Sequence, residues 1–138
     1  MKKLFIDTNI IIDLLARRDP FYDEAAMLFT LADRQKIGLC VSALSFANTN
    51  YILLQSTNPE DAKLILRKLK LIVQVLSLDE KIVGLALNDN DFKDYEDALQ
   101  YFTALENEVD TIITRNLKDF KKAKLLVMTA AQFLKTIK

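Results

Sequence analysis

Carboxylate and amide side chains gather in three short stretches of this 138-residue chain, and their oxygens are the ligands that Mg²⁺ and Mn²⁺ prefer. The first stretch is Asp7-Thr8-Asn9, which directly follows an apolar run. The second contains Asp94 and Asp97, about one helical turn apart, and the third runs from Thr114 to Asp119. Carboxylates that lie close together repel one another, and a divalent cation relieves that repulsion. Such a cation also activates water for attack on a phosphodiester.

Each of these side chains also has a purely structural interpretation. Asp7 could be the N-cap of a helix, because Asp, Thr and Asn are all preferred there. Asp94 and Asp97 could be solvated charges on a helix, and Asn116 with Asp119 could form a turn through Asx hydrogen bonds. Other features of the sequence are needed to distinguish a helix cap from a metal ligand.

Missing residue types exclude several classes of active site. The chain has no histidine, which excludes Ser-His-Asp and Cys-His catalysis and every His-ligated zinc site. Its only glycines are Gly38 and Gly84, so it has no phosphate-binding P-loop and no dinucleotide fingerprint. Lys and Arg balance Asp and Glu at 19 each, so any contact with nucleic acid must come from a local basic patch.

Composition also bears on cellular location. No apolar stretch approaches the roughly 20 residues that span a bilayer, and Asp7 interrupts the apolar run that a signal peptide needs. The single cysteine, Cys40, lies among apolar residues and is expected to be a small buried hydrophobe. We expect one domain over residues 1–138, located in the cytoplasm, with no membrane partner.

Helical segments alternate with short apolar runs, which predicts a parallel sheet covered by helices on both faces. Strands are expected at residues 4–6, 39–42, 72–76, 111–114 and 125–128. Helices are expected at residues 10–16, from the Asp19-Pro20 pair, at 43–54 after Ser42, from the Asn58-Pro59 pair, from a capping box at 77–80 to residue 87, at 95–106, and after Thr129. If the first and fourth strands are parallel, Asp7 and the 114–119 loop leave the sheet at the same edge.

The order of these motifs closely resembles the PIN-domain family, and most strongly the small VapC-type toxins of bacterial toxin–antitoxin pairs. The matching stretches are residues 5–9, 42–45, 94–98 and 113–120, so the likeness covers nearly the whole chain. It implies a three-layer α/β/α fold around a five-stranded, mainly parallel sheet. It also implies cleavage of RNA phosphodiesters that depends on Mg²⁺ or Mn²⁺.

The same resemblance assigns roles to individual residues. Asp7, Asp97 and Asp119 match the metal-binding acids, Asn116 holds a place that is commonly acidic, and Thr114 and Asn9 support the cluster. The basic residues nearest these motifs are expected to engage the RNA backbone; they are Arg115, Lys118, Arg17 and Arg18.

Asn48 departs from the family pattern, which usually has a glutamate at that place on the helix after the second strand. An amide oxygen can still reach a metal ion, but it brings no charge and is a poor general base. By helical spacing Glu96 points away from the face that carries Asp97, so Asp94 is the better candidate to take over the catalytic base role. Replacing Asn48 by glutamate is expected to tighten metal binding.

Two functions remain open. The leading hypothesis is a metal-dependent endoribonuclease toxin, and the alternative is a catalytically weak PIN-fold module that binds RNA or an antitoxin. A flap-endonuclease-like DNA nuclease is disfavoured, because the chain has no room for DNA-clamping elements. The helices that begin near Phe21 and Pro59 carry apolar residues that permit a homodimer and a groove for an antitoxin segment, although ordinary core packing explains them equally well.

Overall fold

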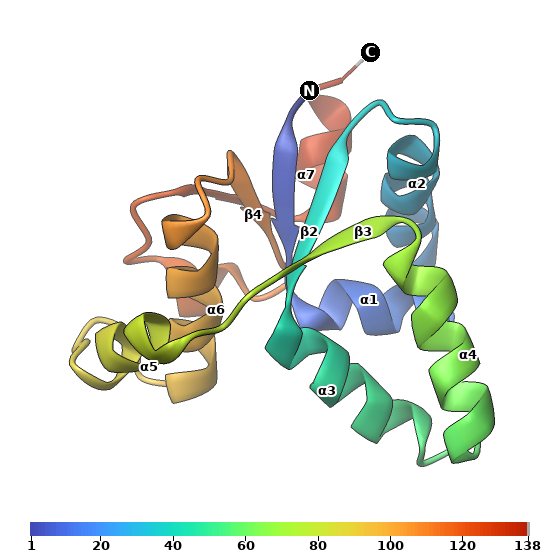
Figure 1. Ribbon diagram of the computed structural model, residues 1–138. Helices are drawn as coiled ribbons and strands as arrows, with labels where there is room; N and C mark the ends of the chain where they lie inside the picture. The colour runs from blue at the N-terminus through green and yellow to red at the C-terminus, as the bar shows by residue number, and fades with distance from the viewer. Residues whose placement is uncertain (138) are drawn as a thin grey trace.

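Five short strands form one parallel sheet in the order β3-β2-β1-β4-β5 (Figure 1). The computed structural model describes residues 1–137. The strands are β1 (Lys3–Ile6), β2 (Gly38–Ser42), β3 (Val73–Leu76), β4 (Thr111–Ile113) and β5 (Leu126–Met128). Every neighbouring pair in this sheet is parallel, so the predicted five-stranded parallel sheet is confirmed.

Seven α-helices and one 3₁₀-helix are found within residues 1–137. They are α1 (Thr8–Leu15), α2 (Tyr22–Asp33), α3 (Ala43–Leu53), α4 (Pro59–Lys70), α5 (Glu80–Leu87), α6 (Tyr95–Glu106), η1 (Leu117–Phe120) and α7 (Ala130–Lys135). Helices α1, α2, α4 and α7 lie on one side of the sheet, and α5 and α6 lie on the other (Figure 1). This is the three-layer α/β/α arrangement that the sequence predicts. No helix of the described residues is long and apolar enough to cross a bilayer.

The two sides of the sheet bury separate apolar clusters. Successive strand residues point to opposite faces, so Leu4 and Ile6 pack with α2 and α7, whereas Phe5 packs with α5 and α6. Cys40 belongs to the second cluster as a buried free thiol, and its burial raises its pKa. Because both faces are covered, the strands read as continuous apolar runs rather than as alternating ones.

Three predicted helix starts are confirmed by their caps. The Ser42 hydroxyl accepts a hydrogen bond from the Ser45 N–H at the start of α3, and Asn58 caps α4 in the same way. Thr129 and Gln132 form a reciprocal capping box at α7. The caps at Ser42 and Thr129 also fix where the chain leaves β2 and β5.

Two other helix starts were predicted wrongly. Helix α2 begins at Tyr22 rather than at Pro20, because the N–H groups of Phe21 and Tyr22 both donate to the Arg18 carbonyl, at 2.9 and 2.8 Å, and the chain turns first. Helix α5 has no capping box from Ser77. Asp79 is its N-cap and accepts from the Ile82 N–H at 3.0 Å. Asp is as good an N-cap as Ser, so the later residue takes the position.

Candidate active site at the carboxyl edge of the sheet

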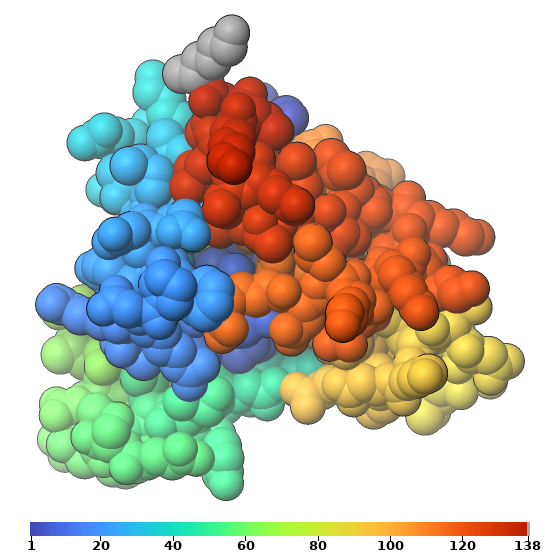
Figure 2. Space-filling model, turned by 180° about the vertical axis from the view of Figure 1, so that it is seen from behind, coloured from blue at the N-terminus to red at the C-terminus, as the bar shows by residue number. Residues whose placement is uncertain are grey.

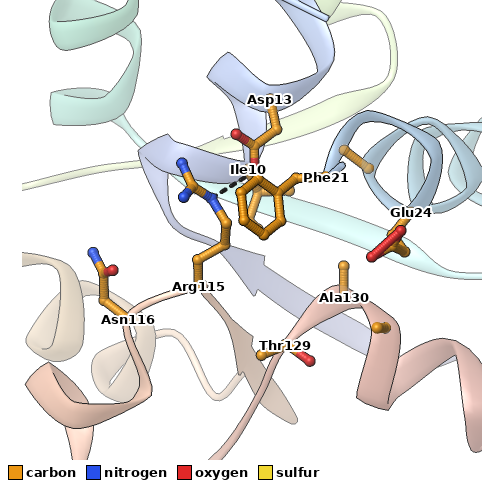
Figure 3. A pocket seen from close by; sticks show the side chains of 10 residues that line it. Ile10, Asp13, Phe21, Glu24, Arg115, Asn116, Thr129 and Ala130 are labelled. Atoms are coloured by element: carbon orange, nitrogen blue, oxygen red, sulfur yellow. Dashed lines mark hydrogen bonds and ion pairs between the residues drawn. The ribbon is translucent and has the colours of Figure 1, made fainter. Parts of the chain in front are cut away.

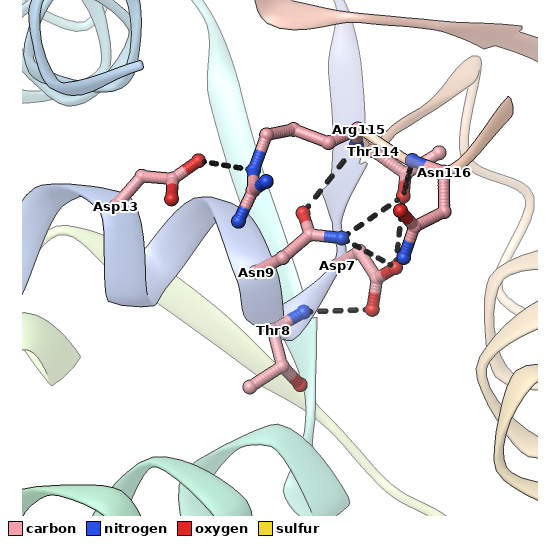
Figure 4. Close-up of polar contacts among 7 residues, drawn as sticks. All are labelled: Asp7, Thr8, Asn9, Asp13, Thr114, Arg115 and Asn116. Atoms are coloured by element: carbon pink, nitrogen blue, oxygen red, sulfur yellow. Dashed lines mark hydrogen bonds and ion pairs between the residues drawn. The ribbon is translucent and has the colours of Figure 1, made fainter. Parts of the chain in front are cut away.

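Asp7 and the loop after β4 leave the sheet at the same edge, as the topology predicts. Strands β1 and β4 are adjacent and parallel, with Ile6 opposite Ile113. The Asp7 N–H continues this pairing by donating to the Ile113 carbonyl at 3.0 Å. Residues separated by more than 100 positions in the sequence therefore begin their loops side by side (Figure 4).

The Asp7 carboxylate is 8% exposed, and hydrogen bonds hold both of its oxygens. Oδ1 accepts from the Thr8 N–H at 2.8 Å, which makes Asp7 the N-cap residue of α1. Oδ2 accepts from the Thr114 hydroxyl at 2.9 Å and from the Asn9 amide at 3.4 Å. Asp7 is thus a helix cap and, at the same time, a buried carboxylate turned toward the loop after β4 (Figure 4).

Asn9 and Thr114 join the start of α1 to the loop after β4. The Thr114 hydroxyl oxygen accepts from the Asn9 amide at 3.3 Å and from the Asn116 N–H at 3.1 Å. The Asn9 carbonyl oxygen in turn accepts from the Arg115 N–H at 3.4 Å. Both residues lie where the sequence predicts supporting groups, and they fix the position of Asp7 against β4 (Figure 4).

A cavity of about 260 Å³ lies beside this carboxylate cluster, between the start of α6 and η1. Three of the predicted acids line it: Asp94, Asp97 and Asp119. Lys118, which was predicted to contact RNA, lies among them, and so do Asp91 and three lysines that the sequence analysis did not single out: Lys93, Lys121 and Lys122. The only sequence signal for two of these lysines was their closeness to Asp119 in the chain.

The charges of the acidic side chains affect one another. Burial, and then the neighbouring charges of Asp94, Asp7 and Asp119, raise the pKa of Asp97 to about 7. The pKa of Asp7 is also raised, mainly by burial, against the opposing effect of its hydrogen bonds from Thr114 and Thr8. Within residues 1–137, Asp7, Asp97 and Asp119 form no ion pair with any Lys or Arg.

The donor chemistry of this cluster suits a hard divalent cation, because it offers several carboxylate oxygens that no ion pair occupies in the described residues. The side chains are not already gathered around a point. Among the described residues, no three acidic or cysteine side chains could hold one metal ion as they lie. Charge and oxygen donors therefore fit a metal ion, and modest side-chain movement would have to bring the oxygens together.

Glu96 does not line the cavity that contains Asp97 and Asp119. Its Oε1 instead accepts a hydrogen bond from the Asn48 amide at 2.5 Å. The Glu96 charge also contributes to the raised pKa of Asp7. Two neighbouring residues in the first turn of α6 thus meet different elements: Glu96 contacts Asn48 on α3, and Asp97 lines the cavity toward η1.

Gln100 is a further site residue that the sequence analysis missed. It is buried one turn after Asp97, where its carbonyl oxygen accepts from the Ser42 hydroxyl at 2.5 Å. Its amide donates to the hydroxyls of Ser45 and Thr8, at 2.8 and 3.3 Å. These bonds tie α6 to β2, α3 and α1 behind the acidic cluster. The sequence signal for Gln100 was its spacing of three residues from Asp97.

Arg115 points away from the acidic cluster, into a second pocket of about 270 Å³ (Figure 3). Its Nε donates to the Asp13 carboxylate at 2.8 Å, and its guanidinium lies 4.2 Å from the centre of the Phe21 ring. Asp13 is only 1% exposed, so this ion pair anchors the loop after β4 to α1. Figure 2 shows the loop in orange beside α2 in blue and α7 in red, which border the same pocket.

Arg17 and Arg18 follow α1 at the end far from Asp7. The Arg17 guanidinium lies over the Tyr22 ring, 5.9 Å from its centre. Burial raises the pKa of the Asp13 carboxyl, and the Arg18 charge opposes that rise less than Arg115 does. Neither arginine lines the cavity that contains Asp97 and Asp119. The basic side chains predicted for RNA are thus divided among three places.

Comparisons with known proteins point to one protein family. A family profile described as PIN domain matches residues 3–118. Ribonuclease VapC1 of Aquifex aeolicus (strain VF5) is 28% identical over 139 residues, which cover 96% of this chain and 93% of that protein. The family profile covers β1 to β4 and the motifs around Asp7 and Asp97, and it ends one residue before Asp119.

Solved structures share the fold. A toxin–antitoxin complex from Klebsiella pneumoniae superposes with a TM-score of 0.70 at 21% identity, covering 92% of this chain and 97% of that one. VapC20 of Mycobacterium tuberculosis, described as a sarcin-ricin loop cleaving toxin, gives a TM-score of 0.66 at 15% identity, covering 89% and 96%. Since the family profile spans most of the chain and the fold agrees with it, this chain belongs to the PIN-domain family.

Proposed function

We propose that this protein is a cytoplasmic, divalent-cation-dependent endoribonuclease that acts as the toxin of a toxin–antitoxin pair. The observation that carries the proposal is the buried Asp7 carboxylate, which hydrogen bonds hold beside Asp97 and Asp119 with no cationic partner in residues 1–137. The relatives described as a ribonuclease and as a toxin–antitoxin complex support the substrate class and the biological role.

Asp7, Asp97 and Asp119 would hold the cation, Mg²⁺ or Mn²⁺, with the Asn116 side-chain oxygen as a further ligand and Asp94 close by. When bound, the cation would supply an activated water molecule and neutralise charge on the phosphate. Thr114 and the Thr8 N–H orient Asp7 through the bonds described above. Asp97, with a pKa near 7, exists in both its protonated and its ionised form at neutral pH, and positive charge that enters the cluster would favour the ionised form.

Lysines beside the cavity would bind the RNA backbone. Lys118 lines the cavity together with Lys93, Lys121 and Lys122, so phosphates next to the scissile bond would meet positive charge there. Arg115 would contact RNA through its terminal nitrogens, since Asp13 holds its Nε. Arg17 and Arg18, beyond the far end of α1, would engage only a longer RNA.

The decisive experiment is cleavage of RNA in Mn²⁺ or Mg²⁺ by the native protein and by Asp7→Asn. The variant keeps the shape of the cap but lacks the charge, so we expect cleavage to fall by at least about 100-fold, while thermal unfolding shows a folded protein. Asp33→Asn, at the exposed end of α2, is the matched control and should cleave as the native protein does. Equal cleavage by the native protein and by Asp7→Asn would contradict the enzyme proposal.

Asn48 favours the alternative, a catalytically weak module that binds RNA or an antitoxin, because it contributes no charge to the cluster. The same samples distinguish the two functions when RNA binding is measured beside cleavage. Tight, salt-dependent RNA binding by the native protein without metal-dependent cleavage would establish the binding module.

We also propose two protein partners, a cognate antitoxin and a second copy of this chain. Apolar side chains of the pocket beside Arg115, from Ile10, Phe21 and Ala130, would receive an antitoxin segment. Helices α3 and α4 contact each other and expose Tyr51, which is 69% exposed, and Leu64, which is 47% exposed. A homodimer would bury these two side chains.

A further inference from the structure

The amide of Asn48 is turned toward a carboxylate on a different helix. Asn48 lies on α3 and Glu96 in the first turn of α6, and the Asn48 Nδ2 donates to Glu96 Oε1 at 2.5 Å. Hydrogen bonds to a carboxylate are stronger than those between neutral groups. The bond therefore restrains a glutamate side chain that would otherwise be free to extend into solvent.

The restrained carboxylate lies on the side of the site that has no acid of its own. Asp97 and Asp119 line the cavity toward η1. On the α3 side is Glu96, whose charge adds to the effect of burial in raising the pKa of the Asp7 carboxyl. Glu96 forms no ion pair with a Lys or Arg within residues 1–137, so its charge stays available to a cation.

We propose that Glu96 is the fourth carboxylate of the cation site and that Asn48 is the residue that positions it. The charge absent from position 48 on α3 is then supplied across the helix interface from α6. Glu96 would contact the cation or a water molecule bound to it, and Asn48 would act only through Glu96. This inference rests on the cation site of the proposed function and adds a ligand to it.

Mn²⁺ binding to the purified protein, measured by titration calorimetry without RNA, tests this inference. Glu96→Gln removes the charge and keeps the size of the side chain, so the Kd for Mn²⁺ should rise at least about tenfold. Asn48→Ala should raise it by a smaller factor, because the carboxylate remains but is no longer held. Glu80→Gln is the matched control, since Glu80 is an exposed glutamate in the first turn of α5, and its Kd should stay within twofold.

A variant that moves the carboxylate from position 96 to position 48 makes the test sharper. The double variant Asn48→Glu/Glu96→Gln moves the carboxylate from α6 to α3 and should bring the Kd back to within about threefold of native. Asn48→Glu alone places two carboxylates against each other, so it should lower the Tm of the metal-free protein and raise the gain in Tm that Mn²⁺ produces. If the double variant restores Mn²⁺ binding, the weaker binding of Glu96→Gln cannot have come from a general loss of folding.

The outcomes separate this inference from the proposed function. If Asp7→Asn abolishes Mn²⁺ binding while Glu96→Gln binds within twofold of native, Glu96 is a solvated helix charge and only this inference is overturned. If the native protein binds Mn²⁺ no better than Asp7→Asn, the cation site fails and the inference fails with it. If Glu96→Gln loses tenfold in affinity but Asn48→Ala binds Mn²⁺ within twofold of native, Glu96 is a ligand and the positioning role of Asn48 is overturned.

Discussion

At the scale of single residues, the acids of this site are of the same type but differ in burial, hydrogen bonding and pKa. Asp7 is buried and fully hydrogen-bonded, so its position is fixed by Thr8 and Thr114. Asp97 lacks such support, and burial together with its acidic neighbours raises its pKa to about 7. A raised pKa in a cavity with a specific set of charged neighbours is typical of functional carboxylates.

The raised pKa of Asp97 predicts how stability depends on pH in the absence of metal. Between about pH 4 and pH 7 the unfolded chain has already lost the Asp97 proton, because the ordinary pKa is 3.8, whereas the folded protein keeps it. Stability should therefore fall as pH rises through this window, and the contribution should level off above pH 7. Chemical denaturation in EDTA at several pH values measures the effect.

Asp97→Asn is the control for this prediction, because it cannot ionise. Its stability relative to the native protein should grow between pH 4 and pH 7 and then stay constant. A difference that does not change with pH would show that the folded protein does not raise the pKa of Asp97. With Mn²⁺ present the native protein should regain stability near neutral pH, while Asp97→Asn should gain little.

At the scale of secondary-structure elements, the caps position the site. Ser42 begins α3 and also donates to Gln100 on α6, so one hydroxyl both caps a helix and joins two helices. Asp7 in the same way caps α1 and faces the loop after β4. Helix starts at the carboxyl edge of the sheet therefore determine where the acidic side chains lie.

Gln100 is predicted to stabilise this arrangement. Gln100→Leu keeps the volume but leaves the Ser42 and Ser45 hydroxyls without their partner, which should cost about 1–3 kcal/mol of unfolding free energy. It should also weaken Mn²⁺ binding, because α6 carries Asp97. Gln55→Leu, at an exposed position, should change stability by less than about 0.5 kcal/mol. Unchanged urea unfolding of Gln100→Leu would show that the network contributes no net stability.

At the scale of the whole molecule, the functional surfaces occupy different parts of the sheet edge and the helical layers. The acidic cavity lies between α6 and η1, whereas the pocket beside Arg115 lies among α1, α2 and α7. The exposed apolar side chains of α3 and α4 lie on other elements again. An antitoxin segment and a second copy of the chain would therefore contact different surfaces, whereas an RNA that reaches Arg115 would border the antitoxin pocket.

The proposed homodimer predicts a measurable change in mass. Replacing both Tyr51 and Leu64 by lysine puts charge on the exposed face of α3 and α4, so the molar mass from light scattering after gel filtration should fall from dimer to monomer. Leu87→Lys, at the end of α5 in the opposite helical layer, is the control and should remain a dimer. A native protein with the mass of a monomer would contradict the prediction.

The sequence by itself determined the sheet, most helix starts, and the edge from which Asp7 and the 114–119 loop emerge. Apolar runs and caps are local signals, and parallel topology then places strand ends together. Only the tertiary structure decided that Glu96 meets Asn48, that Lys93, Lys121 and Lys122 line the cavity, and that Arg115 pairs with Asp13. Periodicity assigns a side chain to a face of its own helix, but it cannot say which element lies opposite. For Glu96, the element opposite is α3, where Asn48 donates to its carboxylate.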